Sequence, residues 1–322
     1  MVIPYIPKST FIYIYVMKIF GTILSIIFCI QIVQAQQISA SDLLFLKKKE
    51  DTLKKVGLQI VQGRNPMDRF VADSLFTRVL VRALKVKNSI YYPFDSIINI
   101  SKILSPDSAF KIYTWQLMIN ENMVRQHGAI QMNTNDGKMK LFGLIDKSDI
   151  TNNMLDTIGD NNGWMGAVYY KIIKKEANNK PIYTLIGFDE NNIKSDKKIM
   201  DILEFVEGKP IFGKKIFLMD KQSSYPKTAS RFILEFKKNA STRLNYDVQK
   251  DAIIFDEMVS EANDPKKKWT LIPDGEQESF TWRAGKWYHS TRVTEGTEAE
   301  KFEAPTQIRD TKGNVIEPKK NK

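Results

Sequence analysis

Residues 110–132 of the chain read FKIYTWQLMINENMVRQHGAIQM, and here the spacing of apolar residues changes from three and four to two. An alternation of this kind is typical of β-strands, whose successive side chains point to opposite faces. We predict two strands joined by the connection NENMVRQ. The first strand would place Ile112, Thr114 and Gln116 on one face and Lys111, Tyr113 and Trp115 on the other.

Short runs rich in β-branched and aromatic residues continue to about residue 293, separated by turn residues such as Asp136-Gly137 and Ala284-Gly285. This arrangement is typical of antiparallel hairpins. About a dozen strands over 109–293 are too many for a small sheet, so we predict a large curved antiparallel sheet, a sandwich or a barrel-like domain. One inserted helix is predicted near 195–206, where Ser195 can cap a segment with Ile199, Leu203 and Val206 on one side.

The region upstream, 36–108, has helical spacing. Ser41-Asp42 can cap a first helix, and the segment 68–85 is predicted to form a second, amphipathic one. A third, shorter helical pattern covers 93–104. The apolar residues of the second helix form two rows, Phe70, Leu75, Val79 and Ala83 in one and Phe76, Leu80 and Leu84 in the other.

These patterns together predict an α+β fold that is mainly antiparallel β. A helical N-terminal region over 36–108 would pack on the β-rich domain over 109–293. From Thr294 onward the chain is polar and ends in a lysine cluster, so we predict an extended or disordered tail over 294–322.

The N-terminus has the pattern of a secretory signal peptide. Lys18 precedes the uncharged run Ile19–Val33, and the small residue Ala35 follows it. A positive region, an apolar region and a small-residue cleavage site define such a signal, so we predict a signal peptide over 1–35 and a periplasmic or secreted protein. Met17 is a natural start, which would make residues 1–16 a misassigned upstream extension. The alternative is an uncleaved membrane anchor.

Cys29 is the single cysteine of the chain. Phe28 precedes it, whereas lipoprotein processing requires a small residue there, so we do not predict a lipid anchor. Cleavage after Ala35 would leave a cysteine-free mature chain, which excludes a disulfide, a thiol nucleophile and a thiolate metal site.

The chain is basic, with a formal net charge of +11. Removing Lys8 and Lys18 with the signal segment leaves about +9, which favours an anionic partner such as an envelope component or a polysaccharide. The lysines occur in short runs without interleaved aromatics, so nucleic acid is not expected as a partner. A membrane is expected as a partner only if the N-terminus stays uncleaved.

Groups suited to catalysis are scarce. His127 and His289 are the only histidines, and no nucleophile elbow, zinc motif or phosphate-binding glycine loop occurs. We therefore predict no catalytic residue, no metal and no cofactor, and we expect both histidines at a surface or strand edge. The oxygen-rich loops 156–163 and 189–192 resemble calcium ligands in composition, but we interpret them as solvated turns because neither fits an EF-hand.

Aromatic residues gather in the β-rich region, where they either fill a core or line a cleft. Trp282 and Trp287 flank the Ala284-Gly285 turn and are expected to face each other across a hairpin. The candidate ligand-binding residues are Tyr113, Trp115, His127, Trp164, Trp282 and Trp287.

A set of short segments carries a resemblance over roughly 90–290. They are YYPFDSI (91–97), SPDSAFKIYTWQ (105–116), HGAIQ (127–131), GAVYYKI (166–172), YTLIGFDENN (183–192), KKIMDIL (197–203), PIFG (210–213), RFILEF (231–236), AIIFDEM (252–258) and IPDG (272–275). With these segments the chain resembles a family of uncharacterised exported proteins of Gram-negative bacteria. The resemblance implies export and a shared domain, and it implies no activity and no catalytic residues.

The sequence thus favours an exported, non-enzymatic binding or structural module of the cell envelope. The alternative is a carboxylate-dependent hydrolase that acts on envelope or extracellular polymers, because the placement of paired acids cannot be deduced from sequence.

The signal peptide gives a direct prediction. Mass spectrometry of the exported protein should find a chain that begins at Gln36, because cleavage follows the small residue Ala35. A mature chain that retains the run Ile19–Val33 would contradict cleavage and support the membrane anchor.

Overall fold

The computed structural model describes residues 37–120, 122–220, 225–291, 308–309 and 315–316. The predicted signal segment 1–35, with Cys29, lies outside these residues. Of the predicted tail over 294–322, the structure describes only β17 (Ile308–Arg309) and β18 (Val315–Ile316), which pair with each other. Among the described residues, no helix is long and apolar enough to cross a bilayer.

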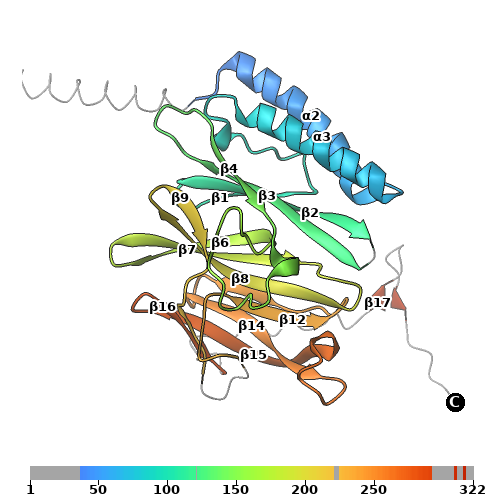
Figure 1. The fold of residues 1–322 in the computed structure, drawn as a ribbon, viewed down its shortest axis with the longest axis vertical. Helices are drawn as coiled ribbons and strands as arrows, with labels where there is room; N and C mark the ends of the chain where they lie inside the picture. The colour runs from blue at the N-terminus through green and yellow to red at the C-terminus, as the bar shows by residue number, and fades with distance from the viewer. Residues whose placement is uncertain (1–36, 121, 221–224, 292–307, 310–314, 317–322) are drawn as a thin grey trace, which may run out of the picture.

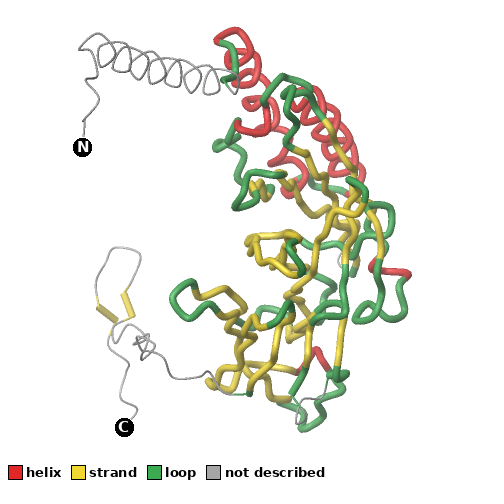
Figure 2. Tube along the Cα trace, turned by 90° about the vertical axis from the view of Figure 1, so that its left-hand side faces the viewer, coloured by secondary structure: helices red, strands yellow, loops and turns green. Residues whose placement is uncertain are grey.

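The described residues form two helices and three larger β-sheets, which are stacked in four layers (Figure 1). The helices lie at one end of the molecule and the strands occupy the rest (Figure 2). The helix layer consists of α2 (Ala40–Gln62) and α3 (Pro66–Leu84). The first sheet has the order β1-β2-β3-β4, with the bounds Ser101–Leu104, Phe110–Asn120, Met123–Met132 and Lys140–Ile145.

Below the first sheet lie the middle sheet and the last sheet. The middle sheet, β5-β9-β8-β7-β6 with β12 paired to β8, has the bounds Gly159–Asp160, Lys209–Phe212, Ser195–Val206, Lys180–Asp189, Val168–Ala177 and Phe232–Lys237. The last sheet, β11-β10-β16-β15-β14-β13, has the bounds Thr228–Ala229, Phe217–Leu218, Lys286–Ser290, Leu271–Arg283, Ala252–Ser260 and Leu244–Asp247. Single 3₁₀ turns cover Ser89–Tyr91, Ser148–Ile150 and Lys268–Thr270.

The fold class is confirmed: the protein is α+β and mostly β, and the strand pairs are antiparallel apart from the β10–β16 pair and an isolated bridge. Three apolar cores separate the layers. One lies between the helices and β2, one between the first and middle sheets, and one between the middle and last sheets. The two faces predicted for β2 are also observed, because Tyr113 and Trp115 face the helices while Ile112 faces the middle sheet.

The helix predicted near 195–206 is wrong, because this segment is strand β8. Ile199 and Leu203 pack against the first sheet, whereas Met200 and Ile202 pack against the last sheet. A strand buried on both faces loses the apolar–polar alternation that identifies strands. Its apolar residues then occur at spacings that also fit a helix.

The helical N-terminal region is shorter than predicted. Ser39, rather than Ser41 or Asp42, caps α2, since its Oγ accepts a hydrogen bond from the Asp42 N–H at 3.1 Å. Asn65 caps α3 in the same way, with Pro66 in the first turn. The third helical pattern, over 93–104, is wrong: the segment contains turns and then β1, which pairs with β2.

Two-residue turns connect several hairpins. Ala284 and Gly285 both have positive φ between β15 and β16, as Asn178 and Asn179 do between β6 and β7. Positive φ at both positions is the requirement of a type I′ turn, whose twist suits a hairpin. The tight turn predicted at 284–285 is therefore confirmed, and Trp282 faces Trp287 across it with 5.2 Å between the ring centroids.

Lys111 is a buried cation on the helix-facing side of β2. Its Nζ donates a hydrogen bond to the Tyr92 carbonyl at 2.7 Å and lies near the rings of Phe94 and Tyr113. Burial, with a smaller effect of the Lys102 charge, lowers the pKa of Lys111 to about 8. The folded protein therefore holds this proton less tightly than the unfolded chain does.

This lowered pKa predicts how stability depends on pH. Between about pH 8 and pH 10 the unfolded chain keeps the Lys111 proton and the folded protein releases it, so the free energy of unfolding should rise with pH. Relative to Lys111→Met, the wild type should gain roughly 2 to 3 kcal/mol over this interval in urea denaturation. A difference between the two proteins that stays constant with pH would contradict the buried charge.

Candidate functional site

A cleft opens where the helices leave half of the first sheet uncovered. Cross-strand register places Trp115, His127 and Ile145 in one row on the helix-facing side of β2, β3 and β4. The helices pack on β2, where Trp115 is only 4% exposed, while Ile145 on β4 is 49% exposed. The β3–β4 half of this face therefore forms the floor of the cleft, which has a volume of about 1120 Å³.

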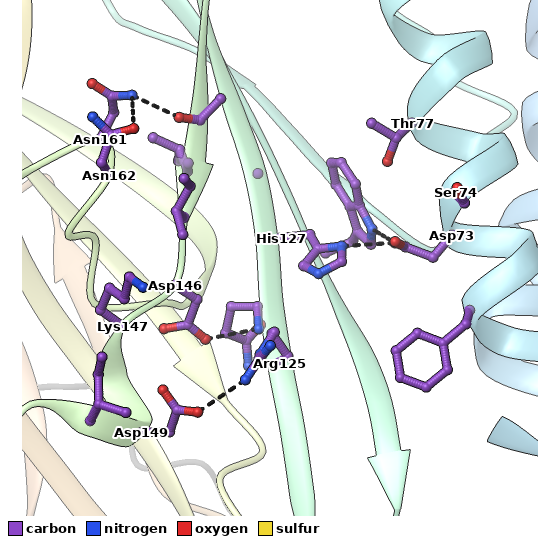
Figure 3. A pocket seen from close by; sticks show the side chains of 18 of the residues that line it. Asp73, Ser74, Thr77, Arg125, His127, Asp146, Lys147, Asp149, Asn161 and Asn162 are labelled. Atoms are coloured by element: carbon purple, nitrogen blue, oxygen red, sulfur yellow. Dashed lines mark hydrogen bonds and ion pairs between the residues drawn. The ribbon is translucent and has the colours of Figure 1, made fainter. Parts of the chain in front are cut away.

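Two walls enclose this floor (Figure 3). The first wall is one side of α3, since its lining residues recur at the spacings that place side chains on a single helix face. The second wall comes from the loop after β4. The first wall consists of Phe70, Asp73, Ser74, Thr77 and Arg78, and the second includes Asp146, Lys147, Asp149, Ile150, Asn161 and Asn162.

Asp73 joins α3 to two strands of the sheet. Its Oδ1 accepts a hydrogen bond from Trp115 Nε1 at 2.7 Å and lies 2.9 Å from His127 Nδ1. Asp73 itself is only 7% exposed, so both contacts are largely shielded from water. Hydrogen bonds to a buried carboxylate are stronger than bonds between neutral groups, and this oxygen therefore fixes the positions of both rings.

The contact with Asp73 also determines which nitrogen of His127 is open. A carboxylate oxygen that already accepts the indole N–H requires a donor at His127 Nδ1, so a neutral imidazole carries its proton there. Nε2 then presents a lone pair on the side of the ring away from Asp73 (Figure 3). The His127 side chain is 29% exposed and lines the cleft. It is therefore a fixed hydrogen-bond acceptor for a ligand.

The other two carboxylates of the cleft are engaged within the protein. Asp146 accepts backbone N–H groups of Gln126, Ser148 and Gly166, each at 3.0 Å. It thereby holds the second wall against β3. Asp149 forms an ion pair with Arg125 at 3.0 Å, and both side chains are partly exposed.

Gly143 keeps the floor open. It pairs with Ala129 on β3, and a Cβ added to Gly143 would have no atom within 4 Å. Its carbonyl accepts a hydrogen bond from Asn161 Nδ2 at 3.0 Å, which joins the strand to the second wall. The absent side chain at this position is thus part of the volume available to a ligand.

The six candidate ligand residues are dispersed over the molecule. Trp115 and His127 line the cleft together. Tyr113 is buried below the helices, and its hydroxyl donates to Gln131 Oε1 at 3.1 Å. Trp164 is fully buried between the first and middle sheets, while Trp287 and the partly buried Trp282 pack between the middle and last sheets.

The expected placement of the histidines at a surface or strand edge is wrong for His289, which is buried, and wrong for His127 only as regards the strand edge. His127 lies inside the first sheet, between Trp115 and Ile145, because β3 begins at Met123 and not at His127. The His289 side chain is 1% exposed, with Nε2 3.2 Å from a Glu278 carboxylate oxygen and with rings of Phe255 and Phe280 nearby. His289 is therefore packed among aromatic rings, whereas His127 contacts the ring of Trp115 and stays partly exposed in the cleft.

Several cleft residues escaped the sequence prediction, Asp73 above all. One signal was present: Asp73 lies three residues before Phe76, in a row of residues that are buried on α3. A carboxylate on the buried face of an amphipathic helix needs a partner. Phe70 and Leu75, by contrast, were predicted on the buried face and are more than a third exposed.

The loop 156–163 is a solvated turn, as predicted, whereas the loop 189–192 is a turn in which Asp189 is buried. Asp160 Oδ1 accepts the Asn162 N–H at 2.8 Å, and Asn192 Oδ1 accepts the Lys194 N–H at 2.8 Å. Over the part of the chain that the structure describes, no group of three or more metal-ligating side chains is close enough to hold a metal ion.

Comparison of the chain with models of protein families, with curated proteins and with solved structures finds no match. The roles of the cleft residues therefore rest on their geometry.

The Asp73 contacts predict a measurable loss of stability. Asp73→Ala leaves the indole N–H of Trp115 buried without an acceptor, so the free energy of unfolding should fall by about 2 to 4 kcal/mol. Chemical denaturation measures this loss. The matched control is Ser74→Ala, the exposed neighbour on α3, which should change the value by less than about 0.5 kcal/mol. Equal effects of the two substitutions would contradict a structural role for Asp73.

Proposed function

We propose that the protein is an exported, non-enzymatic binding module of the cell envelope that takes its ligand in the cleft between α3 and the β3–β4 half of the first sheet. The observation that carries this proposal is the uncovered half-face of a sheet whose other half is packed against helices. A concave surface with apolar walls and a few fixed polar groups is the usual form of a ligand site.

The rigidity of the polar groups supports binding. His127 is held by Asp73, and the second wall is held by the three N–H contacts of Asp146. Groups that are already in position lose little conformational entropy when a ligand arrives. The side chains of Arg125 and Lys147 at the rim are exposed, so they can adjust to a ligand.

Export is part of the proposal and rests on the sequence. Lys18, the apolar run Ile19–Val33 and Ala35 support it. Large aromatic side chains fill all three cores, which is consistent with a chain that needs no disulfide for stability.

A second candidate function, hydrolysis, is favoured by one observation, the Asp73–His127 pair. His127 Nε2 can accept a proton from a water molecule that attacks the ligand, and it can return the proton to the leaving group. The three carboxylates of the cleft are bound by protein donors, so His127 replaces the acid pair expected for a carboxylate-dependent hydrolase. Product released from a bound polymer by the wild type, but not by His127→Gln, would favour this function over binding alone.

The binding proposal predicts the effect of filling the cleft. Gly143→Leu should place a side chain in the open floor without straining the backbone, and so lower affinity at least about tenfold, a loss of roughly 1.4 kcal/mol. An array of envelope and extracellular polysaccharides, probed with wild type and variant, measures this effect.

Lys140→Leu is the matched control, because it adds the same side chain on the same strand at an exposed residue outside the cleft. It should bind like the wild type. Retention of the wild-type binding profile by Gly143→Leu would place the ligand elsewhere and overturn the proposal.

A further inference from the structure

The cleft offers a ligand more hydrogen-bond donors than acceptors. Asp73 is engaged by two rings, Asp146 by three backbone N–H groups and Asp149 by Arg125. Asp73 and Asp146 therefore have little accessible capacity left for a ligand, whereas Asp149 is partly exposed and uses only Oδ2 in its ion pair with Arg125. His127 Nε2 is an open side-chain acceptor in the cleft, and the contact of Nδ1 with Asp73 holds it in position.

Two cations of the cleft have no carboxylate partner among the described residues. Arg78 on α3 donates from Nε to the Ser74 carbonyl at 3.3 Å, which leaves both of its terminal nitrogens open. Lys147, at the second wall, takes part in no ion pair within 37–120, 122–220 and 225–291. Because they lie on opposite walls, the two cations can approach one ligand from both sides. An Arg and a Lys without partners are ready donors for an oxyanion.

The walls also expose apolar surface. Phe70 is 41% exposed, Ile145 49% and Ile150 68%, and all three line the cleft. A ligand therefore needs C–H surface as well as oxygens. The open volume of about 1120 Å³ exceeds the usual size of a small-molecule pocket, which suits a segment of a longer chain.

The end of β4 beside the cleft does not favour a peptide that adds as a strand. Its outer edge is occupied at Ile145, whose N–H donates to the Asn161 carbonyl at 2.8 Å and whose carbonyl accepts the Trp164 N–H at 3.1 Å, and the Gly143 carbonyl accepts Asn161 Nδ2 at 3.0 Å. The floor is the face of the sheet, which offers no free backbone groups. An extended peptide would leave its own backbone groups without partners there.

We propose that the cleft binds a segment of an acidic saccharide, a hydroxyl-rich ring polymer that carries carboxylates. Arg78 and Lys147 bind a carboxylate, His127 Nε2 accepts a ligand hydroxyl, and Phe70, Ile145 and Ile150 contact the C–H faces of the rings. This assignment rests on the proposed function and adds the chemical class of the ligand.

Calorimetric titration of the full chain tests the assignment with a short oligogalacturonate and with the same oligomer after methyl esterification of its carboxyls. The wild type should bind the acid at least about tenfold more tightly than the ester, because only the acid forms charge-assisted hydrogen bonds. The double substitution Arg78→Gln with Lys147→Gln should reduce this preference to less than about twofold. Arg82→Gln is the control: Arg82 lies one turn further along α3, is exposed, and does not line the cleft. It should leave the preference unchanged.

Four results would overturn the assignment: equal or tighter binding of the ester, an unchanged preference in the double variant, a loss as large in Arg82→Gln, or no binding of the acid. An oligoglutamate that binds as tightly as the oligogalacturonate would also overturn it in favour of an acidic peptide. The variant Gly143→Leu distinguishes a wrong ligand class from a wrong binding site. If that variant loses binding of the ester, the cleft is a binding site and only the acidic class is wrong.

Discussion

One carboxylate oxygen, Asp73 Oδ1, ties the helix layer to the first sheet at the edge of the cleft. It accepts the indole N–H of Trp115 on β2 and contacts the imidazole of His127 on β3. A buried carboxylate must keep such partners, because its desolvation is otherwise uncompensated. The position of α3 relative to the strands, and hence the width of the open floor, depends on this contact.

The layers below make that arrangement rigid. The middle sheet is packed on both faces, against the first sheet on one side and the last sheet on the other. The first sheet therefore cannot shift on the middle sheet without disturbing the packing of a second core. Arg231, which is buried against Asp201, donates from Nη1 to the Thr157 carbonyl at 2.8 Å. The loop that forms the second wall is thereby anchored to the middle sheet. The cleft is thus built between a packed helix and a loop with fixed contacts.

The part of the fold that local patterns control could be predicted from the sequence. The alternation over 110–132 predicted the two faces of β2, and the turn residues Ala284-Gly285 predicted a hairpin whose two turn residues have positive φ in the structure. The segment 195–206 could not be predicted in this way, because burial on both faces removes the alternation. The cleft was harder still. Asp73 is 42 residues from Trp115 and 54 from His127, and no local pattern records such a pairing. Two residues of the cleft, Trp115 and His127, were named as candidates from the sequence, but only because of their residue types.

The central claim is that Asp73 fixes His127 with Nε2 open to a ligand in the cleft. Nitrogen-15 NMR of the imidazoles tests it most directly, since the chain has only two histidines and His289→Gln assigns them. At a pH where the ring is neutral, His127 should carry its proton on Nδ1, and a ligand that binds in the cleft should shift the His127 Nε2 resonance. A proton on Nε2 instead, or a bound ligand that leaves this resonance unchanged, would contradict the account.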